Sequence, residues 1–298
     1  MSGPSLQRLR VFVAVARTGG FSAAARALDM AQSTVSTHIR LLEAEVGAQL
    51  FDRTPGRRLT PAGELLLTHA PQVLESYETA VDQLRRLGHG PVEGTLSIGG
   101  TVTAGEGLLP PLLVEYGTLF PEVALEVSIQ NTSATLRALD SGEIAVALVA
   151  ASDEDSNHER ILVGREPQVV IAAAAHPLAG AACVDAADLR GSTILVRESG
   201  STTRRYQQTL MDCWQIPRAR TWTISGTGAI VEAVAAGLGI ACVTRVSAES
   251  ALRLGRVAEL ALEPAPATRP VHLIHRIGRA LSRPEEEFIQ LARERSPR

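Results

Sequence analysis

The feature that most constrains the fold is an alternation of strand-like and helix-like segments, which begins at Thr95 and continues to the end of the chain. Short apolar and β-branched runs, typical of buried strands, are followed by segments with helical periodicity. This alternation predicts an α/β fold. We expect strands at 95–99, 124–130, 144–149, 168–175, 192–196, 220–225, 240–244 and 271–276, and helices at 108–120, 132–139, after 202, from 229 and around 288–292.

The strands fall into two sets, which predict two lobes with the chain crossing between them. We assign about 95–165 and 266–298 to lobe I and about 166–265 to lobe II, so that residues 95–298 form one domain. Two α/β lobes joined in this way resemble the cleft-binding architecture of periplasmic binding proteins.

The composition indicates a globular chain of two or three domains, since 45% of its 298 residues are hydrophobic. No run approaches the ~18 apolar residues of a membrane span. The N-terminus lacks the basic start and apolar core of a signal peptide. We therefore expect a cytoplasmic protein without a membrane partner, and we expect the isolated Cys183, Cys213 and Cys242 to be reduced residues of the core.

The charges are distributed unevenly along the chain. Residues 1–60 hold eight arginines against four acidic residues, a net charge of +4. The remaining 238 residues hold 21 arginines against 28 acidic residues, a net charge of −7. A basic N-terminal unit on an acidic body indicates a polyanionic partner at one end only.

Residues 1–60 carry the pattern of a winged helix-turn-helix. An apolar stripe predicts a first helix that ends at Gly19–Gly20, and Ser22 is expected to cap a short second helix. After a turn at Asp29–Met30, residues 31–47 predict a third helix. A Pro-Gly turn between short extended arms then predicts the wing. The buried stripe of the third helix is expected to consist of Val35, Ile39, Leu42 and Val46.

The opposite face of the third helix is free of acidic residues between Asp29 and Glu43. Short hydroxyls and amides reach base edges in the major groove, where phosphates repel carboxylates, and wing arginines contact the DNA backbone. The alternative is a small three-helix protein-interaction module. We expect a DNA-binding surface composed of Gln32, Ser33, Ser36, Thr37, His38, Arg40, Arg53, Arg57 and Arg58.

Residues 61–88 predict one long helix, with Thr60 as N-cap and Pro61 at the first helical position. Apolar residues recur along it at spacings of three and four, as in a coiled coil. A helix with one apolar seam and no neighbouring sheet is expected to pair with a second copy of the chain. The alternative is an amphipathic helix packed on its own chain. The expected dimer contacts are Leu67, Leu74, Tyr77, Val81 and Leu84.

Two breaks in this region are also predicted. Pro71 removes a backbone hydrogen bond, so that a kink near Leu67 is expected. The glycine-rich residues 89–94 predict a hinge before the α/β domain.

The stretch FSAAARALDMAQSTVSTHIRLLEAEVGAQLFDRTPGRRLTPAGELLL, residues 21–67, resembles the N-terminal signature of LysR-type transcriptional regulators. A looser resemblance extends into the α/β domain and is clearest at 227–243. The family implies a dimerising linker helix and a homodimer or homotetramer. The sequence departs from the family pattern at Ala31, where a capping serine is usual, and at Thr37, where arginine or lysine is common. The resemblance implies DNA contacts by Gln32, Ser33, Ser36, Arg40 and Arg53.

Three strand-to-helix loops of the α/β domain, 99–107, 197–205 and 225–228, are rich in hydroxyls and glycine. Ligands of open α/β sheets bind at such places, and helix N-termini favour anions. Arg197, Arg204 or Arg205 would add positive charge. The alternative is that these residues only form turns and caps. The family resemblance implies effector contacts by Thr101, Thr103, Asn131, Ser201, Thr202 and Thr227.

These patterns together predict a DNA-binding transcriptional regulator that binds operator DNA and is controlled by a small anionic metabolite, without a cofactor or a metal. The stretch RESGSTTR, residues 197–204, is similar to a family subgroup with regulators of carbon fixation and cysteine synthesis. One alternative is a free small-molecule binding or transport receptor with a protein-docking N-terminus. A further alternative is a metabolic α/β enzyme. No catalytic motif supports an enzyme, and His272 and His275 on one strand would face opposite sides.

Overall fold

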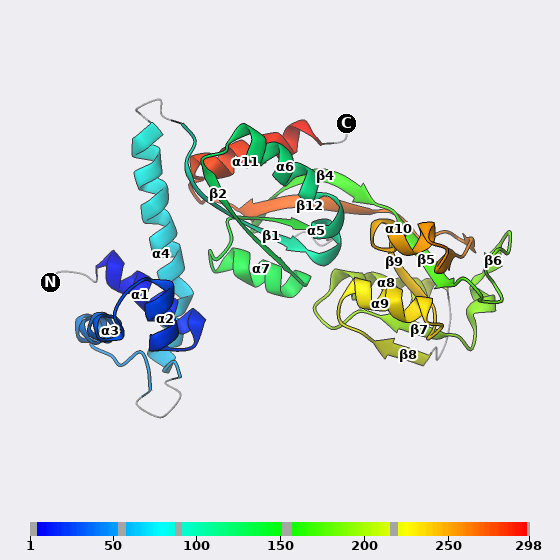
Figure 1. Cartoon of the computed structure of the whole chain (residues 1–298), viewed down its shortest axis with the longest axis horizontal. Helices are drawn as coiled ribbons and strands as arrows, with labels where there is room; N and C mark the ends of the chain where they lie inside the picture. Colours follow the sequence, from blue (N-terminus) through cyan, green and yellow to red (C-terminus); the bar gives the residue numbers. More distant parts are fainter. Residues whose placement is uncertain (1–4, 53–57, 87–90, 151–156, 215–219, 297–298) are drawn as a thin grey trace. The chain divides into compact units, whose positions relative to one another are not determined.

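The structure, a computed structural model, describes residues 5–52, 58–86, 91–150, 157–214 and 220–296. Figure 1 shows the order of its elements along the chain. Contacts divide the chain into two compact units. One contains residues 1–90 with the short segments 141–143 and 279–283, and the other contains the rest.

The first unit is built from α1 (Leu6–Thr18), α2 (Phe21–Ala27), α3 (Gln32–Val46) and α4 (Pro61–Arg86). Asp29, in the left-handed region with φ of +51°, forms the turn between α2 and α3. The rings of Phe12 and Phe21 each lie 5.6 Å from the ring of Phe51. These aromatic contacts hold the three short helices against the segment that follows α3. The buried core includes Leu9, Phe12, Val15, Phe21, Ala24, Val35, Ile39, Leu42, Leu50 and Phe51.

Two details of this unit differ from the sequence-based expectations. Ser22 does not cap α2, because the helix already begins at Phe21 with Gly20 as its N-cap. The Ser22 hydroxyl instead donates a hydrogen bond to Gln32 Oε1, at 3.1 Å. Val46 is 38% exposed, because the buried residues of α3 end at Leu42 and its last turn extends beyond the packed face.

The start of α4 follows the predicted capping pattern. Gly63 donates its backbone N–H to Thr60 Oγ1 at 3.1 Å, and the Thr60 hydroxyl donates to the carbonyl of Gln49 at 2.6 Å. A Cβ on Gly63 would lie 2.2 Å from the carbonyl oxygen of Leu50, so only glycine fits there. The helix then continues through the buried Pro71 to Arg86.

The apolar residues of α4 divide into two groups. Leu67 and Leu74 are half-buried against the helical core of the same chain. Further along the helix, Tyr77 is 48% exposed, Leu84 is 67% exposed and Val81 is half-buried. Packing on the same chain thus accounts for the first two residues, and the proposed dimer contact rests on the last three.

Replacing both Val81 and Leu84 with aspartate is expected to weaken the dimer roughly a hundredfold or more, since burying unpaired carboxylates in an interface costs several kcal/mol. Light scattering at several concentrations would show the smaller species. Leu65→Asp is the matched control, because Leu65 is 64% exposed near the N-terminal end of α4, outside the expected contact. An unchanged mass for the double variant would contradict the dimer contact.

Lobe I is a five-stranded sheet in the order β2-β1-β3-β12-β4. β1 pairs in parallel with β2 and β3, and β12 pairs antiparallel with β3 and β4. Tyr116 of α6 and Phe288 of α11 pack edge to face at 5.4 Å, so α6 and α11 lie together, as Figure 1 shows. The elements are β1 (Gly94–Thr101), α5 (Val102–Gly107), α6 (Leu109–Leu119), β2 (Val123–Gln130), α7 (Thr132–Asp140), β3 (Val146–Val149), β4 (His158–Glu166), β12 (Arg269–Arg276) and α11 (Arg283–Glu294).

Lobe II holds a three-stranded antiparallel sheet, β10-β5-β9, with the pair β7-β8 joined to it by a bridge between Ile194 and Ile240. The chain enters this lobe after β4 and leaves it before β12. Its elements are β5 (Gln168–Ala173), β6 (Val184–Asp185), η1 (Ala186–Leu189), β7 (Thr193–Val196), α8 (Thr202–Cys213), β8 (Arg220–Thr223), α9 (Thr227–Ala235), β9 (Ala241–Thr244), α10 (Arg245–Arg253), β10 (Val257–Glu259) and β11 (Leu262–Glu263).

The predicted two-lobed α/β fold is confirmed, but one expectation about its core is wrong for two cysteines. Cys242 on β9 is buried, and burial raises the pKa of its thiol to about 12. Cys183 and Cys213 are exposed, because one precedes β6 in a loop and the other ends α8.

Candidate DNA-binding surface and effector site

The exposed face of α3 has the chemistry expected of a DNA-reading helix. Gln32, Ser33, Thr37 and Arg40 are exposed and Ser36 is half-exposed. The first acid of the helix, Glu43, accepts hydrogen bonds from the backbone N–H groups of Leu50 at 2.8 Å and Phe51 at 3.4 Å. These bonds hold the carboxylate against the segment that leads into the wing.

Besides Gln32, whose Oε1 accepts the hydrogen bond from Ser22, two predicted contact residues are less available than the others. The Thr37 hydroxyl donates to the carbonyl of Ser33 at 2.9 Å, so its oxygen remains as an acceptor only. His38 is half-buried, and its Nδ1 atom is buried without a hydrogen-bond partner. The roles of these two residues, like those of the other expected DNA contacts, remain predictions.

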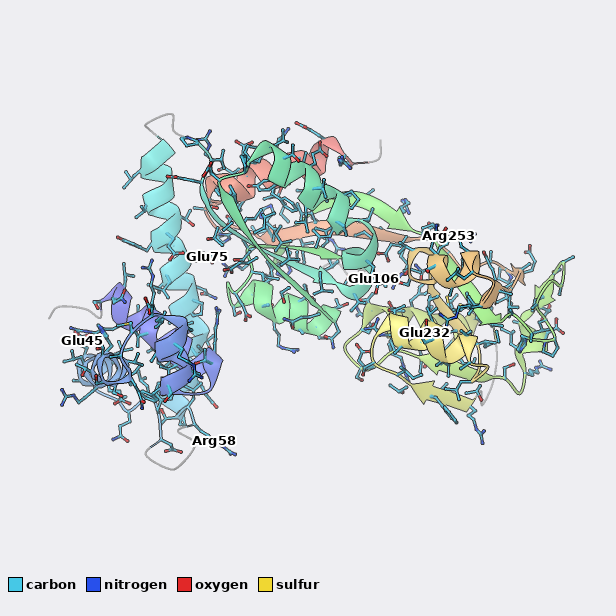
Figure 2. All side chains as sticks on the ribbon, viewed as in Figure 1. Glu45, Arg58, Glu75, Glu106, Glu232 and Arg253 are labelled. Carbon is cyan, nitrogen blue, oxygen red and sulfur yellow. The ribbon has the colours of Figure 1, made fainter. Side chains whose placement is uncertain are left out.

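The base of the wing is a short antiparallel pair between Phe51 and Leu59, in which Asp52 donates its N–H to the carbonyl of Arg58 at 2.8 Å. The Arg58 side chain is exposed beside this pair, as Figure 2 shows. The predicted backbone contacts Arg53 and Arg57 lie outside the described residues.

In the second unit, five of the six predicted effector residues line one small polar cavity, which we call the inner cavity. Its volume of about 10 Å³ is enough for one water molecule at most. The lobes are therefore closed around it. The predicted residues at the inner cavity are Thr101, Thr103, Asn131, Ser201 and Thr202, and the further polar residues are Thr132, Arg197, Thr203 and Arg269.

Hydrogen bonds between the starts of α7 and α8 hold the lobes together at this cavity. The hydroxyls of Thr132 and Thr202 lie 2.7 Å apart, and Ser133 donates its N–H to the carbonyl of Gly200 at 3.0 Å. Gly200 has φ of +84°, and a Cβ there would lie 3.1 Å from Ser133 Oγ. Glycine thus permits the close approach of the two loops.

The sixth predicted residue, Thr227, does not line the inner cavity, because its hydroxyl accepts a hydrogen bond from Arg197 Nη1 at 2.7 Å. Nε and Nη2 of Arg197 each donate to the Glu198 carboxylate at 2.8 Å. These hydrogen bonds lower the pKa of Glu198. Arg204 does not line the inner cavity either. It donates hydrogen bonds to the carbonyl of Arg197 at 3.2 Å and to Thr223 Oγ1 at 3.3 Å. Neither arginine provides the free charge expected from the sequence.

A buried ion pair beside the inner cavity was not anticipated from the sequence. Arg269 Nη2 donates to Glu166 Oε2 at 3.1 Å, and the guanidinium lies 5.4 Å from the ring centre of Tyr206. Burial raises the pKa of Glu166 and lowers that of Arg269. Nε of Arg269 and Oγ1 of Thr101 are buried without a hydrogen-bond partner. The only signal in the sequence was that a charged residue stands at each place where the chain passes between the lobes, Glu166 at the end of β4 and Arg269 at the start of β12.

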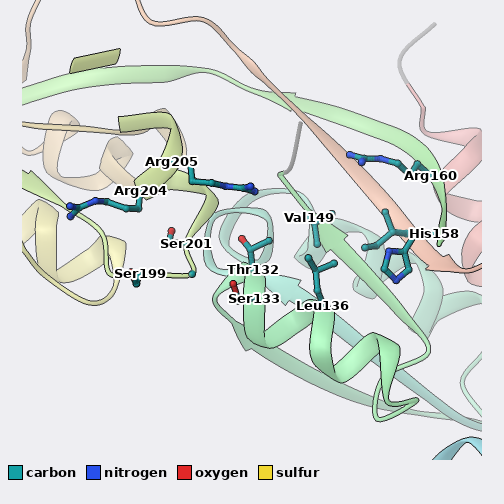
Figure 3. A pocket seen from close by; sticks show the side chains of 12 residues that line it. Thr132, Ser133, Leu136, Val149, His158, Arg160, Ser199, Ser201, Arg204 and Arg205 are labelled. Carbon is teal, nitrogen blue, oxygen red and sulfur yellow. The ribbon is translucent and has the colours of Figure 1, made fainter. Parts of the chain in front are cut away.

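A larger cavity of about 480 Å³, which we call the outer cavity, shares Thr132 and Ser201 with the inner one. Its wall includes Arg160 of β4 and Arg205 of α8, as Figure 3 shows. The sequence indicated Arg205 as one of three possible charges but gave no sign of Arg160, since β4 was not predicted.

Comparison with known protein families finds a match for both units. Residues 6–64 match the family described as "Bacterial regulatory helix-turn-helix protein, lysR family". Residues 89–297, more than half of the chain, match the "LysR substrate binding domain". The chain belongs to the LysR family of transcriptional regulators.

Curated relatives of this LysR-type regulator are similar over most of its length. The transcriptional regulator CfxR of Cupriavidus necator is 31% identical and aligns with 93% of this chain and 87% of its own. CysL of Bacillus subtilis is 32% identical over 80% of this chain and 79% of its own. A full-length OxyR variant from Pseudomonas aeruginosa has the same fold, with a TM-score of 0.75, 25% identity and coverage of 99% and 95%.

These comparisons confirm the predicted family, including its likeness to regulators of carbon fixation and cysteine biosynthesis. As a LysR-type regulator, the protein binds DNA and a small-molecule effector and forms oligomers. The alternative of a free transport receptor is not favoured. Within the described part of the chain, no helix is long and apolar enough to span a membrane and no cluster of His, Cys, Asp or Glu is placed to hold a metal ion.

Proposed function

We propose that this regulator acts in the cytoplasm, without catalytic activity, by reading operator DNA with α3 and responding to a small anion bound between its lobes. Gln32, Ser33, Ser36 and Arg40 would face base edges, and Arg58 would contact phosphates. The domain boundaries at residues 60, 88 and 94 belong to the same proposal.

The observation that carries the effector site is that two residues lining the inner cavity, Thr101 and Arg269, each have a buried polar atom without a hydrogen-bond partner, Oγ1 and Nε respectively. A buried donor or acceptor without a partner costs free energy that a ligand can recover. No acidic residue is among the described residues that line this cavity. The first turns of α7 and α8 add N–H groups and the positive ends of two helix dipoles. This combination favours an anion.

The closed cavity also suggests how the ligand acts. An anion that enters between Thr132 and Thr202 must replace hydrogen bonds that now join the lobes. Binding therefore changes the spacing or tilt of the lobes, and the oligomer transmits that change to the spacing of its DNA-binding units. By linkage, operator DNA must alter effector affinity by the same factor.

Replacing Thr101 with valine and Ser201 with alanine is expected to weaken anion binding about tenfold or more, since each change removes a hydroxyl from the site. Mass spectrometry of molecules retained by the full-length protein would identify the ligand, and calorimetry would measure its affinity. Operator affinity without ligand should not change.

Thr209→Val with Ser250→Ala is the matched control, because both side chains are exposed and remote from the cavity lining. The proposal is wrong if the retained ligand is neutral or cationic, or if the Thr101 and Ser201 changes leave its affinity intact.

A further inference from the structure

Two hydrogen bonds in the DNA-binding unit limit what two side chains of α3 can offer to DNA. The Ser22 hydroxyl donates to Gln32 Oε1 at 3.1 Å, and the Thr37 hydroxyl donates to the carbonyl of Ser33 at 2.9 Å. The side chains of Ser22, Gln32 and Thr37 are exposed, so DNA can reach them. The two bonds have opposite consequences for the hydrogen-bonding groups that remain.

Gln32 remains chiefly a donor. A glutamine amide carries one oxygen that accepts hydrogen bonds and one NH2 group that donates two. Because the oxygen is held by Ser22 of α2, the NH2 group on the other branch of the planar amide is the group left for DNA. Among the described residues, none accepts a hydrogen bond from Nε2 of Gln32. Gln32 therefore offers its N–H groups to the DNA.

Thr37 remains an acceptor only. A hydroxyl group has a single hydrogen, and the Thr37 hydroxyl donates it to the Ser33 carbonyl within the same helix. This bond to the residue four positions earlier is an ordinary conformation of a helical threonine, and Thr68 of α4 makes the same bond to the carbonyl of Glu64 at 3.0 Å. A DNA group that binds the Thr37 oxygen must therefore be a donor.

The two side chains lie at opposite edges of the exposed face of α3. With about 3.6 residues in each helical turn, Gln32 and Thr37 project about 140° apart around the axis of α3. Ser33, Ser36 and Arg40 project between them, and the guanidinium of Arg40 can only donate. The face thus has a donor at one edge and an acceptor at the other.

We propose that Ser22 is a positioning residue for DNA recognition and that α3 reads its operator with a fixed polarity, in which Gln32 donates to a base acceptor and Thr37 accepts from a base amino group. This inference rests on the operator recognition proposed above. In the major groove, the acceptors are guanine N7 and O6, adenine N7 and thymine O4, and the amino groups are those of adenine N6 and cytosine N4. Gln32 therefore contacts a purine or a thymine, and Thr37 contacts an adenine or a cytosine.

The role of Ser22 follows from the shape of the amide. Without the Ser22 hydroxyl, the Gln32 amide can turn over about its last bond, because its oxygen and nitrogen ends have nearly the same size. The oxygen then faces the DNA as readily as the NH2 group does, and an acceptor at that place recognises amino groups instead. Both side chains are exposed and lie outside the buried core of the unit. Loss of the Ser22 hydroxyl should therefore change the base preference and leave the fold intact.

The test starts from the operator that the full-length wild type selects from a random pool of double-stranded DNA. The base pair at which Gln32→Ala loses its preference is the pair read by Gln32, and Thr37→Val marks the pair read by Thr37 in the same way. Base analogues that lack one acceptor, such as 7-deazaguanine, should weaken wild-type binding about threefold to tenfold at the Gln32 pair, the range for one hydrogen bond. Analogues that lack the amino group, such as purine in place of adenine, should do so at the Thr37 pair. Each kind of analogue should have little effect at the other pair.

Ser22→Ala should reduce the base preference at the Gln32 pair about threefold to tenfold and leave the Thr37 pair unchanged. Ser22→Thr keeps a hydroxyl at this place and should retain the wild-type preference. Thr68→Val is the matched control for Thr37→Val, because the Thr68 hydroxyl makes the same bond on α4, outside the face of α3, and this variant should keep both operator and affinity. Circular dichroism of each variant shows that it is folded.

The outcomes separate this inference from the proposed function. If wild type selects an operator and Ser22→Ala keeps the same preference at the Gln32 pair, operator recognition stands and the positioning role of Ser22 is refuted. If the amino-lacking analogues act at the Gln32 pair, or the acceptor-lacking ones at the Thr37 pair, the polarity is refuted. If Gln32→Ala weakens all sequences alike, Gln32 contacts phosphate and its base contact is refuted. Selection of no sequence by wild type would overturn operator recognition itself.

Discussion

Replacing Glu166 with alanine will lower the free energy of unfolding of the effector domain by about 3–5 kcal/mol, the usual cost of breaking a buried ion pair. Arg269 is only 6% exposed, so its guanidinium would be left as an unpaired charge that is largely removed from bulk water. The remaining interactions, with Thr203 Oγ1 at 3.4 Å and the Tyr206 ring, do not supply a negative charge. The loss should be visible as a lower midpoint in urea. Because Trp214 and Trp222 are the only tryptophans of the chain and both lie in lobe II, their fluorescence follows this domain.

Two further variants show whether the unpaired buried charge, and not the loss of a carboxylate as such, lowers the free energy of unfolding. Glu259→Ala removes a similar carboxylate, bound to Arg245 at 2.5 Å but exposed, and should cost at most about 1 kcal/mol. Glu166→Ala combined with Arg269→Met removes both charges and should recover much of the loss. A loss below about 1 kcal/mol for Glu166→Ala would show that the pair is not the buried unit described here.

The elements with clear periodicity were predictable. The stripe Val35, Ile39 and Leu42 indicates a helix covered on one side, and buried strands such as Val146–Val149 are continuous apolar runs. β4 was missed because it is an edge strand in which buried and exposed residues do not alternate regularly. α10 was missed because it begins directly after β9 and turns only Ala248 and Ala251 inward.

The candidate site was predictable only where local chemistry determines it. Hydroxyl-rich loops at strand ends converge because strands of one sheet end at the same edge, and Thr101 and Asn131 indeed meet at one cavity. The arginines were not predictable, since an arginine gives no local sign of its partner. Arg160 and Arg205 reach one cavity from segments 45 residues apart through the packing of two lobes.

Replacing Ser36 and Arg40 with alanine will remove the preference of the protein for its operator, because each lost base contact costs about 1–3 kcal/mol and the cost falls on the specific sequence alone. Arg40 is exposed and Ser36 half-exposed on α3, beside the buried Ile39. Arg58→Ala, which alters only the wing, should weaken all DNA sequences alike and reduce the slope of affinity against salt by about one. Fluorescence anisotropy at two salt concentrations distinguishes the two effects.

The most direct test of a sequence-reading regulator is selection from a random pool of double-stranded DNA with the full-length protein. Wild type is expected to enrich one sequence made of two related half-sites, as a two-fold dimer requires. The Ser36→Ala and Arg40→Ala double variant, shown by circular dichroism to be folded, is expected to enrich no common sequence or a different one. Enrichment of the same sequence with the same affinity by this variant would contradict the placement of α3 in the major groove, and no enrichment by wild type would contradict operator recognition altogether.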